Sequence, residues 1–202
     1  FSGPNVNFSP LQVHVMSTSN VSFIAVIIKR KPFFSYVSFQ AVHIPVQAPK
    51  EFTEKYIGSY KYGWHALRKD RQNAVKDLGL IPASVPMKRM ATTDDWDKLS
   101  EEEKRYNDKR MAVYAGMVDA MDHHIGRLIQ YLKESGQYDN TVIIFTSDNG
   151  PAASELPLLW IKALGYNRDY ETLGERYSYG TIGASFGSAA ASPLGHYKFH
   201  SG

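Results

Sequence analysis

The amino-acid sequence predicts an α/β fold in which helices flank a layered, parallel-rich sheet. Two stretches, 21–28 and 141–146, are almost entirely apolar, which is typical of strands buried on both faces of a parallel sheet. Between them, apolar residues recur every three or four positions from 111 to 132, as in an amphipathic helix. A strand, a long helix and a second strand indicate the βαβ unit of a parallel sheet.

The composition limits the size of the protein and its classes of partner. A chain of 202 residues with 43% hydrophobic and 21% charged residues is ordinary for one globular domain. The net charge of +3, with acidic and basic residues interspersed, predicts no nucleic-acid partner. No apolar run reaches the roughly 18 residues of a membrane span. The absence of cysteine excludes disulfides, thiolate metal sites and a cysteine nucleophile within this chain.

The N-terminal quarter contains one further predicted strand. Residues 1–20 mix Ser, Asn and Pro, and we expect them to form an irregular N-terminal segment. The stretch 32–39, "PFFSYVSF", is rich in aromatic residues and predicts a strand. Pro45 and Pro49 then exclude regular structure, so a stiff loop follows this strand.

Two helices are predicted in the middle of the chain. Residues 51–80 have a helical pattern that stops at Gly79. Ser100 and Glu103 form a capping box that begins the long helix, and Gly136 ends it. Its predicted apolar face consists of Met111, Tyr114, Met117, Val118, Met121, Ile125, Leu128, Ile129 and Leu132.

The residues after the strand 141–146 are the first candidates for a site. Ligands of parallel sheets bind beyond the carboxyl ends of the strands, where Asp148 and Asn149 lie and Gly150 allows a turn. A carboxylate beside an amide oxygen offers hard donors, which suit Ca²⁺ or Mg²⁺. The alternative is an Asx turn without a ligand, since Asp and Asn are common where strands end.

His43 and Lys198 are the other candidates. His43 follows the strand 32–39 on the stiff loop, where it can donate a proton to an anionic substrate or bind it. Lys198 can bind an anion as a point charge. The alternatives are a hydrogen-bonded loop histidine and a solvated surface lysine. His196 and His200 flank Lys198 and would share its face on a strand.

Several of these segments together resemble the sulfatase family, in particular its bacterial arylsulfatase branch. The 111–150 stretch is specific, because "MVDAMDHHIGRLI" leads into "TSDNG". The matching stretches, in family order, are 31–72, 111–150, 166–180 and 192–202. The resemblance implies an alkaline-phosphatase-like α/β fold and hydrolysis of small-molecule sulfate esters at a calcium site, with Mg²⁺ as the alternative ion.

The resemblance also implies roles for the candidate residues. Asp148 and Asn149 match the two late metal ligands of the family. His43 matches the histidine that contacts the sulfate and the leaving oxygen, and Lys198 is similar to the late lysine that binds the sulfate and aids departure of the leaving group. Fixed positive charge at these positions would stabilise the charge that develops as the S–O bond breaks.

Several family features are missing from the chain: the early pair of Asp metal ligands, a further Lys and His, and the motif that carries the nucleophile. Sulfatases use formylglycine made from the first residue of a C/S-x-P-S-R motif, and no such motif is present. We therefore expect 21–202 to be part of an incomplete sulfatase catalytic domain that hydrolyses sulfate esters very slowly or not at all alone. Its expected partners are the missing N-terminal half or a second copy of itself, because an incomplete sheet leaves an unpaired edge.

Two other functions remain open from the sequence. The chain can belong to a phosphatase or phosphonate monoester hydrolase of the same superfamily, which shares metal-binding Asp and His residues. It can also be a non-catalytic remnant that binds an anion or Ca²⁺.

Overall fold

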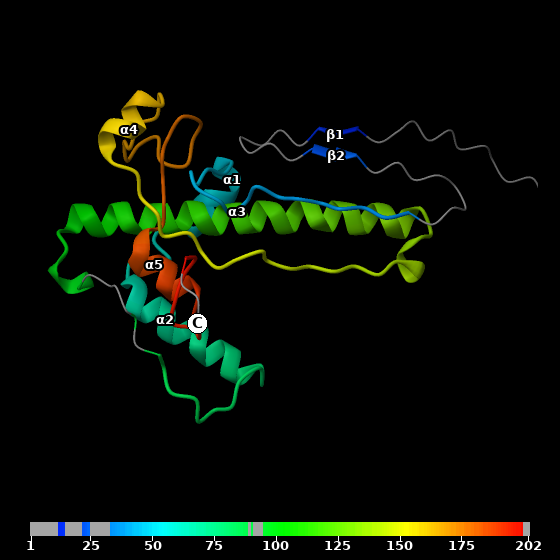
Figure 1. The fold of residues 1–202 in the computed structure, drawn as a ribbon, viewed down its shortest axis with the longest axis horizontal. Helices are drawn as coiled ribbons and strands as arrows, with labels where there is room; N and C mark the ends of the chain where they lie inside the picture. The colour runs from blue at the N-terminus through cyan, green and yellow to red at the C-terminus, as the bar shows by residue number, and fades with distance from the viewer. Residues whose placement is uncertain (1–11, 15–21, 25–32, 89, 91–94, 200–202) are drawn as a thin grey trace, which may run out of the picture.

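The computed structural model describes residues 12–14, 22–24, 33–88, 90 and 95–199, and helix α3 is its long axis. The other helices gather around the N-terminal half of α3 (Figure 1). The helices are α1 (Lys50–Thr53), α2 (Gly63–Asp77), α3 (Glu101–Glu134), α4 (Leu158–Ala163) and α5 (Gly183–Ala190). The 3₁₀ turns are η1 (Glu54–Tyr56), η2 (Trp96–Lys98) and η3 (Tyr138–Asn140), and the strands are β1 (Gln12–His14) and β2 (Ser22–Ile24).

The predicted capping box begins α3. The Ser100 hydroxyl accepts a hydrogen bond from the Glu103 amide at 3.2 Å, and the Glu103 carboxylate accepts one from the Ser100 amide at 2.8 Å. The helix ends at Glu134, and Gly136 follows in the left-handed conformation, with φ of 68°. Both predicted ends of the long helix are therefore confirmed.

Residues 51–80 form two separate helices, so the prediction of one helix through this range is wrong at 57–62. The chain leaves the helical path after η1 and re-enters it at α2. Gly63, at the start of α2, has a φ of 83°, and a Cβ there would lie 2.5 Å from the Trp96 ring. Only glycine permits this turn against the indole. Gly79 follows the end of α2, as predicted.

Helix α3 holds the turn that separates these two helices. The Asp108 carboxylate accepts hydrogen bonds from the amides of Gly58 at 2.7 Å and Tyr60 at 2.8 Å. On the same helix, Gly116 approaches Thr53 so closely that a Cβ would lie 3.0 Å from the Thr53 backbone. A tertiary contact thus overrides the local helical pattern of 51–80.

Two hydrophobic clusters form the core beside the N-terminal half of α3. In the larger cluster, the Trp64 ring packs edge-on against Trp96 at 4.9 Å and Phe186 at 5.6 Å. Such aromatic pairs contribute about 0.5–1.5 kcal/mol beyond burial. The buried members are Trp64, Met90, Trp96, Met111, Ile182, Phe186 and Ala189 in this cluster, and Val46, Ala48, Val113 and Met117 in the smaller one.

The described strands form one antiparallel pair near the N-terminus. Gln12 is opposite Ile24 and His14 is opposite Ser22. β1 lies inside the segment 1–20, so the prediction of irregular structure is wrong at these three residues. They form a strand because they pair with β2. β2 lies within the predicted strand 21–28, and the other residues of both segments lie outside the described part of the chain.

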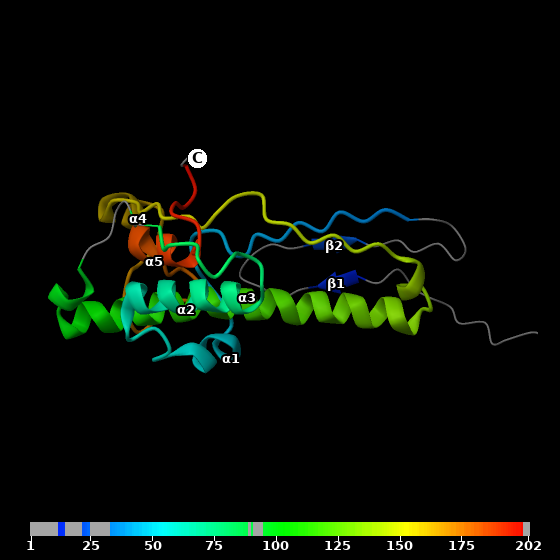
Figure 2. The ribbon, with the colours of Figure 1, turned by 90° about the horizontal axis from the view of Figure 1, so that it is seen from below.

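The two other predicted strands are extended segments without a partner. Neither 33–40 nor 141–147 has strand pairing in the described structure. Both segments run alongside the C-terminal half of α3, on the same side of the helix (Figures 1 and 2). Val142 is 87% exposed and Ile144 is 82% exposed, so the prediction of a buried strand at 141–146 is wrong. A strand needs a neighbour to bond its backbone, and the described residues supply none there.

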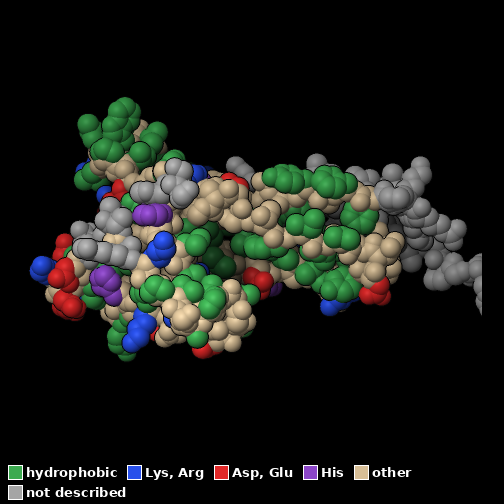
Figure 3. All heavy atoms as spheres, turned by 60° about the horizontal axis from the view of Figure 1, so that its bottom comes forward, with side chains coloured by type: hydrophobic (Ala, Val, Ile, Leu, Met, Phe, Trp, Pro, Cys, Tyr) green, Lys and Arg blue, Asp and Glu red, His purple; other side chains and the backbone are tan. Residues whose placement is uncertain are grey.

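These segments expose apolar side chains that would normally be buried. We define the apolar strip as Phe34, Tyr36, Val142, Ile144 and Phe145, each of which is at least 71% exposed. Hydrophobic side chains gather along this elongated half of the molecule in the space-filling view (Figure 3). Contiguous apolar surface of this kind marks association sites in soluble proteins.

A buried guanidinium ties α2 to the C-terminal part of the chain. Arg68 is 1% exposed, and its Nη1 donates to the carbonyl oxygens of Ser188 at 2.9 Å and Leu194 at 3.1 Å. Its Nη2 donates to the carbonyl of Lys88 at 2.6 Å. The Ser192 hydroxyl donates to the Arg68 carbonyl at 3.0 Å. Burial lowers the pKa of Arg68, but guanidinium remains charged at neutral pH.

None of the helices in the described part of the chain combines the length and hydrophobicity that crossing a bilayer requires.

Replacing Arg68 with Met tests this tie. The carbonyls of Ser188, Leu194 and Lys88 would lose their guanidinium donor, and the bond to Ser188 is buried, so we expect Arg68→Met to lower the free energy of unfolding by about 2–4 kcal/mol. Urea denaturation measures it. The matched control is Arg71→Met on the exposed side of α2, with an expected change below about 0.5 kcal/mol. Equal effects of the two substitutions would refute the structural role of Arg68.

Charges placed on the apolar strip test its role in association. We expect the 202-residue chain to self-associate and the double variant Val142→Lys/Ile144→Lys to shift it towards the monomer, because lysine blocks edge pairing. Sedimentation velocity at several concentrations measures this shift. The control is Leu159→Lys on α4, a 78% exposed position outside the strip. A monomeric parent chain, or an equal shift in the control, would contradict the prediction.

Candidate functional site

Asp148 and Asn149 lie in an exposed bend directly after the extended segment 141–147. The Ser147 hydroxyl donates to the Asn149 carbonyl at 2.6 Å, which closes the bend. Both side chains are exposed to solvent. The bend therefore presents a carboxylate and a carboxamide next to each other, at the end of the segment where the sequence predicts them.

The backbone of Lys198 packs against this bend. The Lys198 amide donates to the Pro151 carbonyl at 3.0 Å, and a Cβ on Gly150 would lie 3.5 Å from the same amide nitrogen. The Lys198 Nζ lies 5.5 Å from the centroid of the Phe199 ring. Two segments that are about fifty residues apart in sequence thus meet at one hydrogen bond.

Helix α5 supports both of these segments from one side. A Cβ on Gly187 would lie 3.3 Å from the Ala153 Cβ and 3.6 Å from the Tyr197 Cβ. Gly187 is therefore the place where the residues after Asn149 and the residues before Lys198 rest on the same helix. A Cβ at position 187 would be tight against Ala153 and in ordinary contact with Tyr197.

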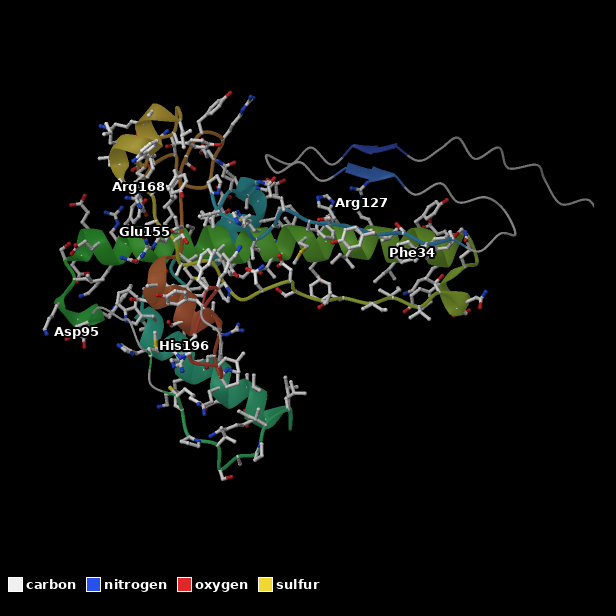
Figure 4. The ribbon with its side chains drawn as sticks, in the orientation of Figure 1. Phe34, Asp95, Arg127, Glu155, Arg168 and His196 are labelled. Carbon is white, nitrogen blue, oxygen red and sulfur yellow. The ribbon has the colours of Figure 1, made fainter. Side chains whose placement is uncertain are left out.

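Residues 196–199 are not a strand, so the predicted alternation of His196, Lys198 and His200 on one face does not apply. His196 is exposed and lies beside α2 and α5 (Figure 4). His200 lies outside the described residues.

His43 is on a loop with its ring fixed by its own neighbour. Its Nδ1 lies 2.7 Å from the Ile44 carbonyl oxygen. A carbonyl only accepts hydrogen bonds, so Nδ1 carries a proton and Nε2 is the atom left for a ligand. The ring is exposed. Among the described residues, no hydrogen bond or ion pair joins His43 to Asp148, Asn149 or Lys198.

The segment 174–180 holds the loop that carries His43. The Val46 amide donates to the Gly180 carbonyl at 2.8 Å, and the Gln47 side chain donates to the Ser178 carbonyl at 2.9 Å. Val46 is 1% exposed and belongs to the core. The backbone three residues after His43 is thus anchored, while the His43 ring remains accessible.

Glu155 forms an ion-pair cluster just beyond the Asp148–Asn149 bend. Its Oε1 lies 2.8 Å from Arg110 Nη1 and accepts from the Thr181 hydroxyl at 3.2 Å, and its Oε2 lies 3.4 Å from Arg168 Nη2. Glu155 and Arg168 lie close together above α3 (Figure 4). Burial raises the pKa of the Glu155 carboxyl, but Arg110 and then Arg168 lower it more, so the pKa is below its usual value.

Consecutive residues of one segment contact both site loops. Gly180 accepts from Val46 on the His43 loop, and Thr181 donates to Glu155 on the loop after Asn149. The structure therefore brings the segments of Asp148, Asn149 and Lys198 into direct contact and connects the His43 loop to them through 180–181. The sequence missed Glu155 and its partners because no spacing or motif relates positions on three distant segments.

The donor set at the bend suits a hard cation only in part. Within the described residues, no group of three or more His, Asp, Glu or Cys side chains is placed to hold a metal ion. Asp148 and Asn149 offer oxygen donors of the right chemistry for Ca²⁺. Two side chains do not complete a shell of six to eight oxygens.

Comparison with known proteins identifies the family. A family model described as Sulfatase matches residues 15–179. An uncharacterized sulfatase of Schizosaccharomyces pombe is 44% identical over 173 residues, which are 82% of this chain and 31% of that protein. An arylsulfatase of Klebsiella aerogenes is 30% identical over 175 residues, which are 84% of this chain and 37% of that protein.

A relative from another branch matches a shorter stretch. A multifunctional alkaline phosphatase superfamily protein of Trinickia caryophylli is 43% identical over 58 residues, which are 29% of this chain and 11% of that protein. The chain spans about a third of the length of the first two relatives, at 31% and 37%. The family model covers most of the chain and implies an alkaline-phosphatase-like α/β fold. The chain therefore belongs to the sulfatase family.

Proposed function

We propose that this chain is part of an arylsulfatase-like enzyme that hydrolyses sulfuric esters. The observation that carries the proposal is the hydrogen bond from the Lys198 amide to the Pro151 carbonyl. It sets a lysine segment against the bend that contains Asp148 and Asn149. A carboxylate that would hold a cation, beside a segment that carries a lysine, would suit an ester with an anionic sulfate.

The proposed chemistry assigns a separate task to each residue. Lys198 binds the sulfate as a point charge and stabilises the negative charge that grows on the leaving oxygen. His43 contacts the sulfate through Nε2 and, when doubly protonated, donates a proton to the leaving oxygen. Its Nδ1 hydrogen bond to the Ile44 carbonyl holds the ring in the required tautomer.

Asp148 and Asn149 are the proposed protein ligands of Ca²⁺, with Mg²⁺ as the alternative ion. When bound, such an ion would supply Lewis-acid stabilisation of the sulfate oxygens. The other ligands would come from water or from groups outside the described residues, since the described part holds no fuller cluster. The chain has no cysteine and no serine in x-P-S-R context, so the nucleophile that attacks the sulfur as the bond to the leaving oxygen breaks would come from a part of the enzyme other than residues 1–202.

A second candidate is hydrolysis of phosphate or phosphonate monoesters. The match to the multifunctional alkaline phosphatase superfamily protein favours it, since that relative shares 43% identity over 58 residues. Phosphate monoesters carry more negative charge than sulfate monoesters at neutral pH, so the same cation and lysine suit them electrostatically. The two candidates differ in substrate preference.

Substitution of Lys198 tests the proposed reaction. In the protein encoded by the natural reading frame that contains this chain, we expect faster hydrolysis of p-nitrophenyl sulfate than of p-nitrophenyl phosphate. Lys198→Ala should lower kcat/KM for the sulfate by about 100-fold, the usual effect of losing one charge-stabilising donor. The control is Lys162→Ala, an exposed lysine on α4. A preference for the phosphate would favour the second candidate instead.

Calcium titration tests the proposed ligands. We expect Asp148→Asn and Asn149→Ala each to weaken Ca²⁺ binding at least tenfold, as measured by calorimetry. Asp148→Asn removes the negative charge of one proposed ligand, and Asn149→Ala removes the oxygen of the other. The control is Asp139→Asn, an exposed aspartate in η3. Calcium binding without sulfate ester hydrolysis would support a non-catalytic remnant. Equal binding by the Asp148→Asn variant and the parent protein would refute the ligand assignment.

A further inference from the structure

The strongest unexplained feature outside the proposed ligands is the ion pair between Arg110 and Glu155. The Arg110 side chain is 13% exposed and the Glu155 side chain is 42% exposed, so the pair is shielded on the arginine side. Surface ion pairs have weak effects, but a guanidinium held in one buried geometry fixes its carboxylate partner more strongly. Arg110 lies on α3, the longest of the described helices.

Close packing leaves the Arg110 guanidinium little freedom. A Cβ on Gly183 would lie 2.6 Å from Arg110 Nη2, and Gly183 has a φ of 67°. A side chain at that position would therefore displace the guanidinium. Gly183, the first residue of α5, therefore leaves room for the Arg110 guanidinium to pack against the helix.

Thr181 connects this pair to the beginning of α5. Its hydroxyl donates to Glu155 Oε1 at 3.2 Å and accepts from the Gly183 amide at 3.1 Å. Both capacities of the hydroxyl are used, and Thr181 is 1% exposed. The position of Glu155 is thus coupled to the helix on which the Asp148 and Lys198 segments also rest.

The residues between Asn149 and Glu155 are held at each end. Pro151 accepts from the Lys198 amide, Ala153 packs at Gly187, and Glu155 pairs with Arg110. The next residue to Thr181, Gly180, holds the His43 loop through Val46. A shift of Glu155 would therefore change the placement of the Asp148–Asn149 bend relative to both Lys198 and His43.

We propose that Glu155, fixed by Arg110 and Thr181, is a positioning residue that sets the Asp148–Asn149 bend in the orientation required for cation binding. This inference rests on the proposed function, since it assumes that the bend binds Ca²⁺. Glu155 acts through the backbone, and all three of its described polar partners are protein groups: Arg110, Arg168 and Thr181. Groups that hydrogen-bond directly to metal ligands commonly change metal affinity by about 10–100-fold, and we expect the lower end of that range for a residue that acts through the backbone.

The test measures Ca²⁺ affinity by calorimetry in the protein encoded by the natural reading frame. We expect Glu155→Gln to raise the dissociation constant about tenfold, because the neutral amide loses the charge-assisted bond to Arg110. Thr181→Val should also raise it, since it keeps the shape but removes the hydroxyl. Thr181→Ser keeps the hydroxyl and should restore the parent affinity. Urea denaturation of each variant shows whether it is folded at the titration temperature.

The matched control is Glu175→Gln, which removes an ion pair of similar length, 2.9 Å to Lys50, on the same segment as Thr181. We expect its affinity for Ca²⁺ to stay within twofold of the parent. If Glu155→Gln does not fold, Thr181→Val and Thr181→Ser decide the question, because they leave all charges in place.

The outcomes separate this inference from the proposed function. If Asp148→Asn loses Ca²⁺ while Glu155→Gln and Thr181→Val bind it like the parent, the positioning role is refuted and the proposed ligands stand. If Asp148→Asn binds Ca²⁺ like the parent, the proposed ligand set is wrong and the positioning role fails with it. A loss shared by Glu175→Gln would also overturn the positioning role, because the effect would be general.

Discussion

Burial of one face of the N-terminal half of α3 is the constraint on which the rest of this structure depends. Val113 and Ala112 are 0% exposed, and Met111 and Met117 are at most 5% exposed. Four other parts of the chain cover this face: α1 with the turn after it, α5, the segment around Val46 and the segment around Leu173. Burial of large apolar side chains such as Met111, Val113 and Met117 contributes roughly 1.5–3 kcal/mol each, whereas a typical neutral hydrogen bond contributes about 0.5–1.5 kcal/mol.

The polar contacts at the candidate site follow from that packing. Once α5 and the segment before it are placed on α3, Arg110, Gly183 and Thr181 occupy fixed positions. The chain after Asn149 can then be held at Glu155, and the chain before Lys198 can rest at Gly187. The convergence of the site segments is thus a consequence of helix packing.

The C-terminal half of α3 presents a different situation. The extended segments 33–40 and 141–147 run alongside this half of the helix. Their apolar side chains are exposed to water, and their backbones have no strand partner in the described structure. A β-strand is completed by neighbours that are distant in sequence. The candidate cation-binding bend is at the end of one of these segments, so the described contacts that hold it come from the loop after it rather than from a sheet before it.

Local chemistry determined the parts of this protein that the sequence could predict. The capping box at Ser100 and the glycine at 136 are interactions between near neighbours, and their predictions are confirmed. The predicted apolar face of α3 is confirmed as buried at Met111, Met117 and Leu132, whereas Val118 is 42% exposed. The family resemblance also came from contiguous motifs, and the Sulfatase model confirms it over residues 15–179. Only the tertiary structure decided that 51–80 divides into two helices and that the Lys198 backbone meets Pro151. The tertiary structure alone also decided that Glu155 lies between two arginines. Each of these contacts joins residues that are far apart in the sequence, and no periodicity or motif relates their positions.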